Sequence, residues 1–321
     1  MVDWAGNVIT PVDQRKNEMC MAKASTKRKA RCNVARNFVM LISFLLSVNS
    51  VSMAEDLLIR HIQPEGTLDK RGDYYLALLT LALEKTQVKY GDFHLVMNEN
   101  RMLQARALQS VAKKQFVDVV WTMTSKEREA SLLPIRIPLL KGLLGYRIFI
   151  IKEQDKGKFE QIQTLEDLSE LVAGQGHDWP DVSILRANGL TVTVGASYDG
   201  LFRMLSAGRF DYFPRGMNES WSEVQAHKEK GFIVEDNLLL KYPAPIYFFV
   251  HKASTALAQR IEEGLLLAIE DGSFDSIFYE HPANKEIFKL TNIKNRKVFD
   301  LRNPLLPAKT PLNEHRLWYL P

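Results

Sequence analysis

Downstream of residue 56, short apolar segments alternate with segments in which apolar residues recur every three or four positions. The short segments are typical of buried strands, and the longer spacing is typical of one buried helix face. Strands that alternate with helices predict an α/β protein with largely parallel sheets. The expected strands are 57–62, 93–97, 117–121, 145–152, 172–176, 190–194, 210–213 and 247–250, and the expected helices are 73–85, 101–113, 165–171, 180–187, 198–206 and 257–268.

The order of these elements predicts two lobes joined by two hinge crossings. The fourth expected strand leaves a first α/β unit, a second unit follows, and the last expected strand returns the chain to the first. We therefore expect residues 55–145 plus 245–321 to form lobe 1 and residues 146–244 to form lobe 2. Ligands of open α/β sheets bind beyond the carboxyl ends of strands, so two facing lobes predict one ligand cleft that a hinge can close.

Residues 1–54 have the pattern of a cleaved secretion signal. An apolar stretch at 38–48 follows a positive region, and small residues precede a cut after Ala54. This stretch is shorter than the roughly 20 residues that span a bilayer, although an uncleaved membrane anchor stays an alternative. A translation start at Met21 would make the preceding residues a misassigned extension. The positive region comprises Lys27, Arg28, Lys29, Arg31 and Arg36.

Charge and cysteine content restrict the partners and the compartment. The chain has 42 Lys/Arg and 38 Asp/Glu, and residues 1–54 contain eight of the basic and three of the acidic residues. The rest of the chain is therefore nearly neutral and gives no reason to expect nucleic-acid binding. Both cysteines, Cys20 and Cys32, precede the predicted cut, so the mature protein would have no disulfide and no thiolate metal site. We expect a soluble, monomeric periplasmic protein without a cofactor.

No catalytic or metal-binding motif is present in the sequence. It lacks the nucleophile-elbow, phosphate-loop, zinc-protease and dinucleotide-binding patterns, and its seven histidines do not show metal-ligand spacing. His177 and Asp178 are adjacent, which favours a polar helix entrance over an acid–base pair. His61 ends the first strand and is therefore a possible ligand contact.

Three segments, in order, resemble a known family. The first segment is residues 121–128 (Trp-Thr-Met-Thr-Ser-Lys-Glu-Arg), which precede two prolines and a strand into the second lobe. The second is residues 205–212, where Gly-Arg-Phe-Asp joins a helix to a strand. The third is residues 247–274, which contain a return strand and a helix ending in Asp-Gly-Ser-Phe. The chain resembles extracellular solute-binding proteins of family 3, amino-acid-binding proteins with the type II periplasmic binding protein fold. The resemblance covers about 57–279.

The resemblance implies that Arg128 pairs with a ligand carboxylate. A guanidinium can hold a carboxylate through two parallel hydrogen bonds. The alternative is that Arg128 is one charge on a surface helix. Thr122 and Thr124 are neighbouring hydroxyl candidates, and Trp121 either stacks on the ligand or lies in the core.

In lobe 2, the resemblance places the turn 174–180 against the ligand. A helix N-terminus offers free N–H donors and partial positive charge to an anionic group. Gly176 would allow close approach, and Trp179 would be a wall of the cleft or a packed loop residue. The ligand-binding residues expected here are Gly176, His177, Asp178 and Trp179.

One position departs from the family pattern. Amino-acid-binding members carry a second Asp after the Gly-Arg-x-Asp step, and here that position is Gly216, beside Arg215. Arg128 and Arg215 together predict a ligand with one or two anionic groups. Glu219 or Glu223 could replace the missing acid, or each could be a solvated helix charge.

These observations predict a periplasmic protein that closes on a small polar, carboxylate-bearing solute. Its partner would be the membrane subunits of an ABC importer or a membrane sensor. The alternative is an exported small-acid lyase on the same fold, with His61, Asp178 or Glu219 as the acid–base group. A membrane-anchored interaction protein is a third class, and it would require an uncleaved leader.

Overall fold

The computed structural model describes residues 57–64 and 69–319. The predicted secretion signal, its cut at Ala54 and both cysteines lie outside the described residues. Among the described helices, none combines the length and apolar composition needed to cross a membrane. The fold is α/β and has two lobes, which we define by their strands.

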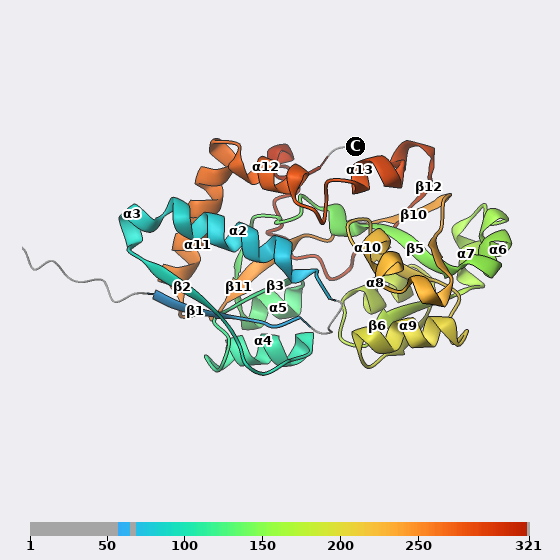
Figure 1. Ribbon diagram of the computed structural model, residues 1–321, viewed down its shortest axis with the longest axis horizontal. Helices are drawn as coiled ribbons and strands as arrows, with labels where there is room; N and C mark the ends of the chain where they lie inside the picture. The colour runs from blue at the N-terminus through green and yellow to red at the C-terminus, as the bar shows by residue number, and fades with distance from the viewer. Residues whose placement is uncertain (1–56, 65–68, 320–321) are drawn as a thin grey trace, which may run out of the picture. The chain divides into compact units, whose positions relative to one another are not determined.

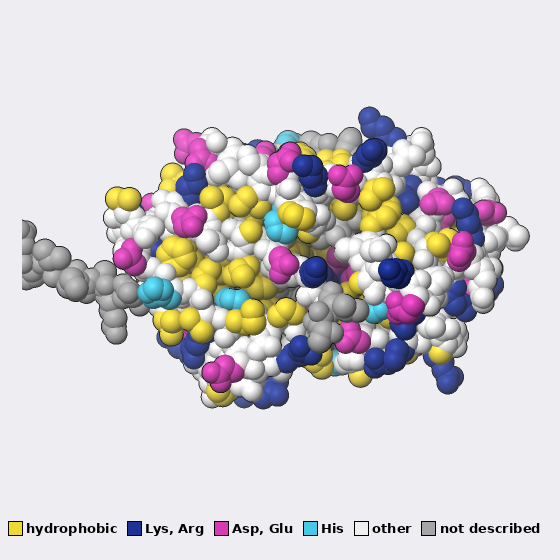
Figure 2. Space-filling view, viewed as in Figure 1, with side chains coloured by type: hydrophobic (Ala, Val, Ile, Leu, Met, Phe, Trp, Pro, Cys, Tyr) yellow, Lys and Arg dark blue, Asp and Glu magenta, His cyan; other side chains and the backbone are white. Residues whose placement is uncertain are grey.

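Lobe 1 is built on two sheets (Figure 1). In one, β1 and β2 are parallel, and in the other β11 is the central strand and is antiparallel to both neighbours. Hydrophobic side chains gather on the part of the surface that Figure 2 draws over this lobe, and Leu58 and Val96 of the β1–β2 pair are exposed. The strands are β1 (Leu57–His61), β2 (Phe93–Met97), β3 (Val119–Met123), β4 (Leu133–Ile135) and β11 (Ile246–Val250).

Helices α2 and α11 pack against each other and supply much of the lobe 1 core. The helix α2 buries six residues at helical spacing, as its apolar periodicity predicts. Gly264 lets α11 approach closely, because a Cβ there would lie 1.9 Å from the carbonyl oxygen of Ala82. The helices are α2 (Gly72–Lys85), α3 (Gln87–Tyr90), α4 (Gln104–Ala112), α5 (Lys126–Ser131), α11 (Thr255–Glu270), α12 (Ser273–Glu280) and α13 (Ile287–Thr291).

Lobe 2 has β5 as its central strand, with six of seven residues buried. β5 is antiparallel to β8, β9 and β10, while β6 and β7 form a parallel pair. The C-terminal strand β12 is parallel to β10, so residues 297–300 lie with lobe 2 strands. The strands are β5 (Tyr146–Lys152), β6 (Val172–Gly176), β7 (Thr191–Gly195), β8 (Phe213–Gly216), β9 (Phe232–Val234), β10 (Leu238–Lys241) and β12 (Lys297–Asp300).

Short helices cover the lobe 2 strands, and two begin with a side-chain cap. Ser197 accepts from the amide of Gly200, which confirms the predicted cap of α9, and Thr164 forms a capping box with Asp167. The helices are α6 (Lys156–Glu160), α7 (Leu165–Ser169), α8 (Asp181–Ala187), α9 (Tyr198–Ser206) and α10 (Ser220–Ala226), and the 3-10 turns of the chain are η1 (Leu143–Gly145), η2 (Glu153–Asp155), η3 (Lys228–Lys230), η4 (Ile293–Asn295) and η5 (His315–Leu317).

Strand direction and one strand boundary differ from the sequence expectation. The sheets are not largely parallel, because the central strands β5 and β11 belong to segments that cross between lobes and run against most of their neighbours. The expected strand at 210–213 begins three residues later, as β8. Residues 297–300 of the C-terminal tail form the additional strand β12. The residue boundaries of the two lobes stay a prediction.

Candidate functional site

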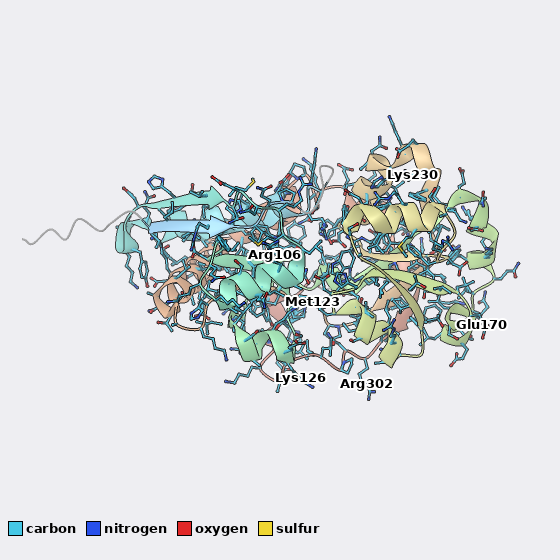
Figure 3. The ribbon with its side chains drawn as sticks, turned by 90° about the horizontal axis from the view of Figure 1, so that it is seen from below. Arg106, Met123, Lys126, Glu170, Lys230 and Arg302 are labelled. Atoms are coloured by element: carbon cyan, nitrogen blue, oxygen red, sulfur yellow. The ribbon has the colours of Figure 1, made fainter. Side chains whose placement is uncertain are left out.

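A cavity of about 140 Å³ is lined by residues of both lobes. From lobe 1 it receives the last residues of β1, β2 and β3, which are His61, Met97 and Met123. Met123 is labelled in Figure 3, which draws the side chains around it. From lobe 2 it receives the turn after β6 and the end of β8, represented by Trp179 and Arg215. The cavity therefore lies at the carboxyl ends of strands, where open α/β sheets bind ligands.

Aromatic rings form one part of the lobe 1 wall. Tyr75 of α2 stacks on Trp121 of β3, with 5.7 Å between ring centroids and 23° between planes. The ring centroid of His61 lies 6.3 Å from that of Trp121. Burial raises the pKa of Tyr75 well above its usual value, so its hydroxyl stays protonated. The wall offers flat apolar surface together with a phenol and an imidazole.

His61 presents a defined hydrogen-bonding edge to this cavity. Its Nδ1 lies 3.0 Å from the carbonyl oxygen of Ile62. A carbonyl oxygen can only accept, so in the neutral ring Nδ1 carries the proton and Nε2 is an acceptor. Burial lowers the pKa of His61 and so favours the neutral ring. The hydrogen bond to Ile62 acts in the opposite direction and is the weaker of the two effects.

Arg215 is the most enclosed cation of the lobe 2 wall. It is 2% exposed and its Nε and Nη2 donate to Glu223 at 2.8 and 2.7 Å. Its Nη2 also lies 2.9 Å from Glu219, and its guanidinium lies 4.9 Å from the Trp179 ring centroid. Burial alone would lower the pKa of Arg215, but the two carboxylates raise it. The cation is thus fixed and compensated by two acids.

Glu219 lies close to the position that a side chain at Gly216 would occupy. Its Oε2 accepts from the Gly216 amide at 2.8 Å and would lie 3.1 Å from a Cβ built on that glycine. Burial opposes its ionisation, but Arg215, Arg147 and Arg71 lower its pKa. Glu219 lines the cavity and Glu223 is buried behind it, so neither is a solvated helix charge.

A second buried pair connects the cavity to the hinge. Arg147, at the start of β5, lies 2.6 Å from Asp181 and 3.5 Å from Glu219. Tyr242, in the second crossing segment, donates to Asp181 at 2.5 Å and accepts from Arg147 Nε at 3.0 Å. Burial would lower the pKa of Arg147, but Asp181, Tyr242 and Glu219 raise it. The hydrogen bonds join both crossing segments to acids of the pocket wall.

Arg71 brings a lobe 1 cation against lobe 2 rings. Its Nε and Nη2 donate to Asp69 at 2.7 and 2.9 Å. Its guanidinium lies 4.4 Å from the ring centroid of Tyr198 and 5.8 Å from that of Trp179. Such cation–π contacts hold the start of α2 against the second lobe.

Arg128 is buried beneath the cavity wall and is not among the residues that line it. Its Nη1 donates to Thr122 and to the carbonyl of Met123, and its Nη2 donates to Gln104. Nη2 also donates to the carbonyl of Asp178 in lobe 2, at 3.2 Å. Burial lowers the pKa of Arg128 to about 10, against the attraction of nearby carboxylates that include Asp178.

Asp178 makes a further contact between the lobes. Its Oδ2 accepts from the amide of Ala105, in the first turn of α4, at 2.8 Å. Carboxylates are stabilised at helix N-termini, where amides lack partners within the helix. Together with the Arg128 contact, this hydrogen bond joins lobe 1 to lobe 2 beside the cavity.

The predicted ligand-binding residues divide into two groups. The cavity brings together His61, Trp121, Thr122, Trp179 and Arg215. The other five are placed around it: Thr124 donates to Glu129, Gly176 lies beneath the Trp179 ring, His177 is exposed, and Arg128 and Asp178 bond to each other.

Several lining residues were not singled out from the sequence. Arg147 carried a usable signal, because one arginine interrupts the apolar strand GYRIFIIK. Asp181 follows Pro180 at a helix start, where an acid is ordinary, and Asp69 and Arg71 had no distinguishing pattern. Within residues 57–64 and 69–319, no group of three or more metal-ligating side chains comes together.

Comparison with solved structures assigns the fold. An ancestral arginine-binding protein bound to glutamine is 18% identical, with a TM-score of 0.54 over 72% of this chain and 100% of that chain. An arginine-specific periplasmic binding protein from Salmonella typhimurium is 14% identical, with a TM-score of 0.53 over 69% and 97%. A putative ABC-transporter binding component from Wolinella succinogenes, complexed with lysine, is 14% identical, with a TM-score of 0.52 over 70% and 94%.

These similarities confirm the type II periplasmic binding protein fold predicted from the sequence. No protein-family model and no curated protein sequence matches the chain.

Proposed function

We propose that the chain is a solute-binding protein that closes its two lobes around a small polar solute. The observation that carries this proposal is the cavity at the strand ends, walled by both lobes. A solute that contacts both walls binds the closed state more tightly than the open one, and that difference drives closure.

The solute that fits the pocket best is an amino acid with a carboxylate and an ammonium group. The buried ionic wall contains the cations Arg71, Arg147 and Arg215 and the anions Asp69, Asp181, Glu219 and Glu223. Because every one of these arginines already has a carboxylate partner, the wall offers no excess positive charge to a dianion. The three solved structures described above, bound to or specific for glutamine, arginine or lysine, support the same class.

Within this proposal, residues of both lobes contact the solute. Trp121 and His61 supply a flat surface and an acceptor from lobe 1, with Thr122 beside them. Trp179 and Arg215 face them from lobe 2, and Arg215 approaches the solute carboxylate. Glu219 pairs with the ammonium, taking the role that Gly216 lacks the side chain to perform.

The membrane partner is the remaining part of the proposal. A lobe pair that changes from open to closed presents a different surface to the importer subunits of an ABC transporter or to a membrane sensor. Export to the periplasm as a monomer, through the signal at 1–54, is consistent with either partner.

A thermal-shift screen followed by calorimetric titration tests this function. Against a panel of the twenty amino acids and small dicarboxylates, we expect selective stabilisation by amino acids. Glu219→Gln should weaken binding of the best one by about tenfold or more, since it removes a buried charge partner. Glu170→Gln is the matched control, because that side chain is exposed and lies far from Met123 in Figure 3. Preferential stabilisation by dicarboxylates would contradict the proposed solute class.

A further inference from the structure

The chain crosses between the lobes again after β12, through a short segment near its C-terminus. On the lobe 2 side, β12 pairs with β10 and the Leu301 amide donates to the carbonyl of Lys241. Arg302 is then held by Asn188, whose Nδ2 donates to the Arg302 carbonyl at 2.8 Å and whose Oδ1 accepts from its amide at 3.0 Å. Residues 297–302 are therefore fixed to lobe 2.

Three residues further along, the same segment is fixed to lobe 1. The Lys126 amide donates to the carbonyl of Leu305 at 3.0 Å, and the Lys126 Nζ donates to the carbonyl of Pro304 at 2.9 Å. Between the two anchors, Asn303 donates to the carbonyl of Pro243, which belongs to the second crossing segment, at 2.8 Å. Figure 3 labels Lys126 and Arg302, which mark the two sides of this crossing.

Beyond Leu305 the tail stays on lobe 1. The Tyr319 amide donates to the carbonyl of Lys141, and Trp318 packs on Gly142, where a Cβ would lie 2.5 Å from its ring. Leu317 is buried in the main core. The lobe 1 end of the segment is therefore held by packing and not only by the Lys126 hydrogen bonds.

Both anchors belong to helices that form or support the pocket walls. Lys126 begins α5, which follows the pocket residue Met123, and Asn188 caps the end of α8, which begins at the pocket residue Asp181. Lys126 and Asn188 belong to different lobes, so any opening that moves them apart must extend the chain that joins them. The chain that joins them is the stretch from Arg302 to Leu305.

We propose that residues 302–305 are a tether that limits how far the two lobes open, an inference that rests on the proposed closure. Three extended residues span at most about 11 Å, so Arg302 on lobe 2 and Leu305 on lobe 1 cannot lie further apart than that length, and both lobes are bound to it while the hydrogen bonds of Asn188 and Lys126 hold. A short tether also reduces the conformational freedom of the open state, which favours the closed one. The tether makes this chain a binding protein with a restricted opening.

Lengthening the tether tests the proposal without removing either anchor. Six Gly/Ser residues inserted between Asn303 and Pro304 add a flexible chain of about 13 Å mean end-to-end distance. The control is the same insertion between Leu312 and Asn313, two exposed residues on the lobe 1 side of both anchors. Spin labels at Lys113→Cys and Arg203→Cys, exposed on α4 and α9, report the lobe separation, with Cys20 and Cys32 replaced by serine.

The readout is the distance distribution between the labels by double electron–electron resonance, without added solute. We expect the 303/304 insertion to shift the distribution to longer distances by several ångströms, and the 312/313 insertion to leave it unchanged. Identical distributions in all three proteins would overturn the tether. Because no solute is present, this result is independent of the titration, so a protein that opens more widely but binds no amino acid would contradict the proposed function alone.

Discussion

At the scale of single residues, the lobe 2 wall of the pocket is built from ion pairs in which both partners are buried. Arg215 and Glu223 are 2% and 4% exposed and hold each other through two hydrogen bonds. Such pairs contribute little net stability compared with apolar residues of the same shape, but loss of one partner leaves an uncompensated buried charge. The geometry of the lobe 2 wall therefore depends on keeping each pair complete.

Arg215→Met should lower the free energy of unfolding by about 3–5 kcal/mol, because Glu219 and Glu223 would both lose their main cation. Urea denaturation monitored by circular dichroism measures this change. The exposed Arg209→Met is the control and should stay within about 0.5 kcal/mol of the original chain. Equal stability of the two variants would show that the Arg215 pairs do not hold the wall.

Two buried histidines and one half-buried histidine predict a pH dependence of stability. Burial lowers the pKa of His61, His227 and His281 below the value of about 6.5 that histidine has in an unfolded chain. As pH falls below 6.5, the unfolded chain takes up protons before the folded one does, so the free energy of unfolding falls. Each histidine contributes up to about 1.4 kcal/mol per pH unit.

Urea denaturation at pH 7.5 and 5.5 measures this effect, and we expect lower stability at pH 5.5. His227→Gln should reduce the difference between the two pH values, whereas the exposed His315→Gln should not change it. A protein that is more stable at pH 5.5 would contradict the assignment of these histidines as neutral groups.

At the scale of helices and strands, apolar pattern predicted elements with several apolar positions and gave no bounds for helices that have few. Strand β2, strand β6 and helix α9 have the predicted bounds, because each is delimited by turn or cap residues. Helices such as α5 and α10 have too few apolar positions to show a helical period. Polar contacts support these helices: Ser125 caps the start of α5, and Glu223 of α10 pairs with Arg215 of β8.

The α2–α11 contact provides a test at this scale. Gly264→Ala should destabilise the protein by about 1–3 kcal/mol, because its Cβ would overlap backbone atoms of Ala82 that cannot move alone. Gly157→Ala in α6 is the matched control, since nothing lies within 4 Å of its Cβ position, and it should be neutral or stabilising by up to about 1 kcal/mol. Thermal unfolding of both variants gives the comparison, and a neutral Gly264→Ala would contradict the close packing.

At the scale of the whole molecule, the order of elements was enough to predict two lobes and a cleft, but not which residues meet there. The pairing of Arg147 with Asp181 joins positions 34 residues apart, and nothing in either local sequence indicates the partner. Glu219 was one of two candidates for the acid missing at Gly216, and its carboxylate lies at that position because α10 starts there. Predictions from motif position named His61, Trp121 and Trp179, which do line the cavity.

The contacts between lobes give the closed arrangement a physical basis. Asp178 bonds to Ala105 and Arg128 across the cleft, and the 302–305 segment is hydrogen-bonded to both lobes. The solute then adds its own contacts to both walls. We therefore propose that the cavity is the binding site and that both lobes contact the solute at once.

The most direct measurement is a crystal structure of the protein with the amino acid that stabilises it most in the thermal-shift screen. We expect electron density for that molecule inside the cavity, with its ammonium group beside Glu219 and the rest of the molecule against Trp121. Density at any other place on the protein, with the cavity filled only by water, would contradict it.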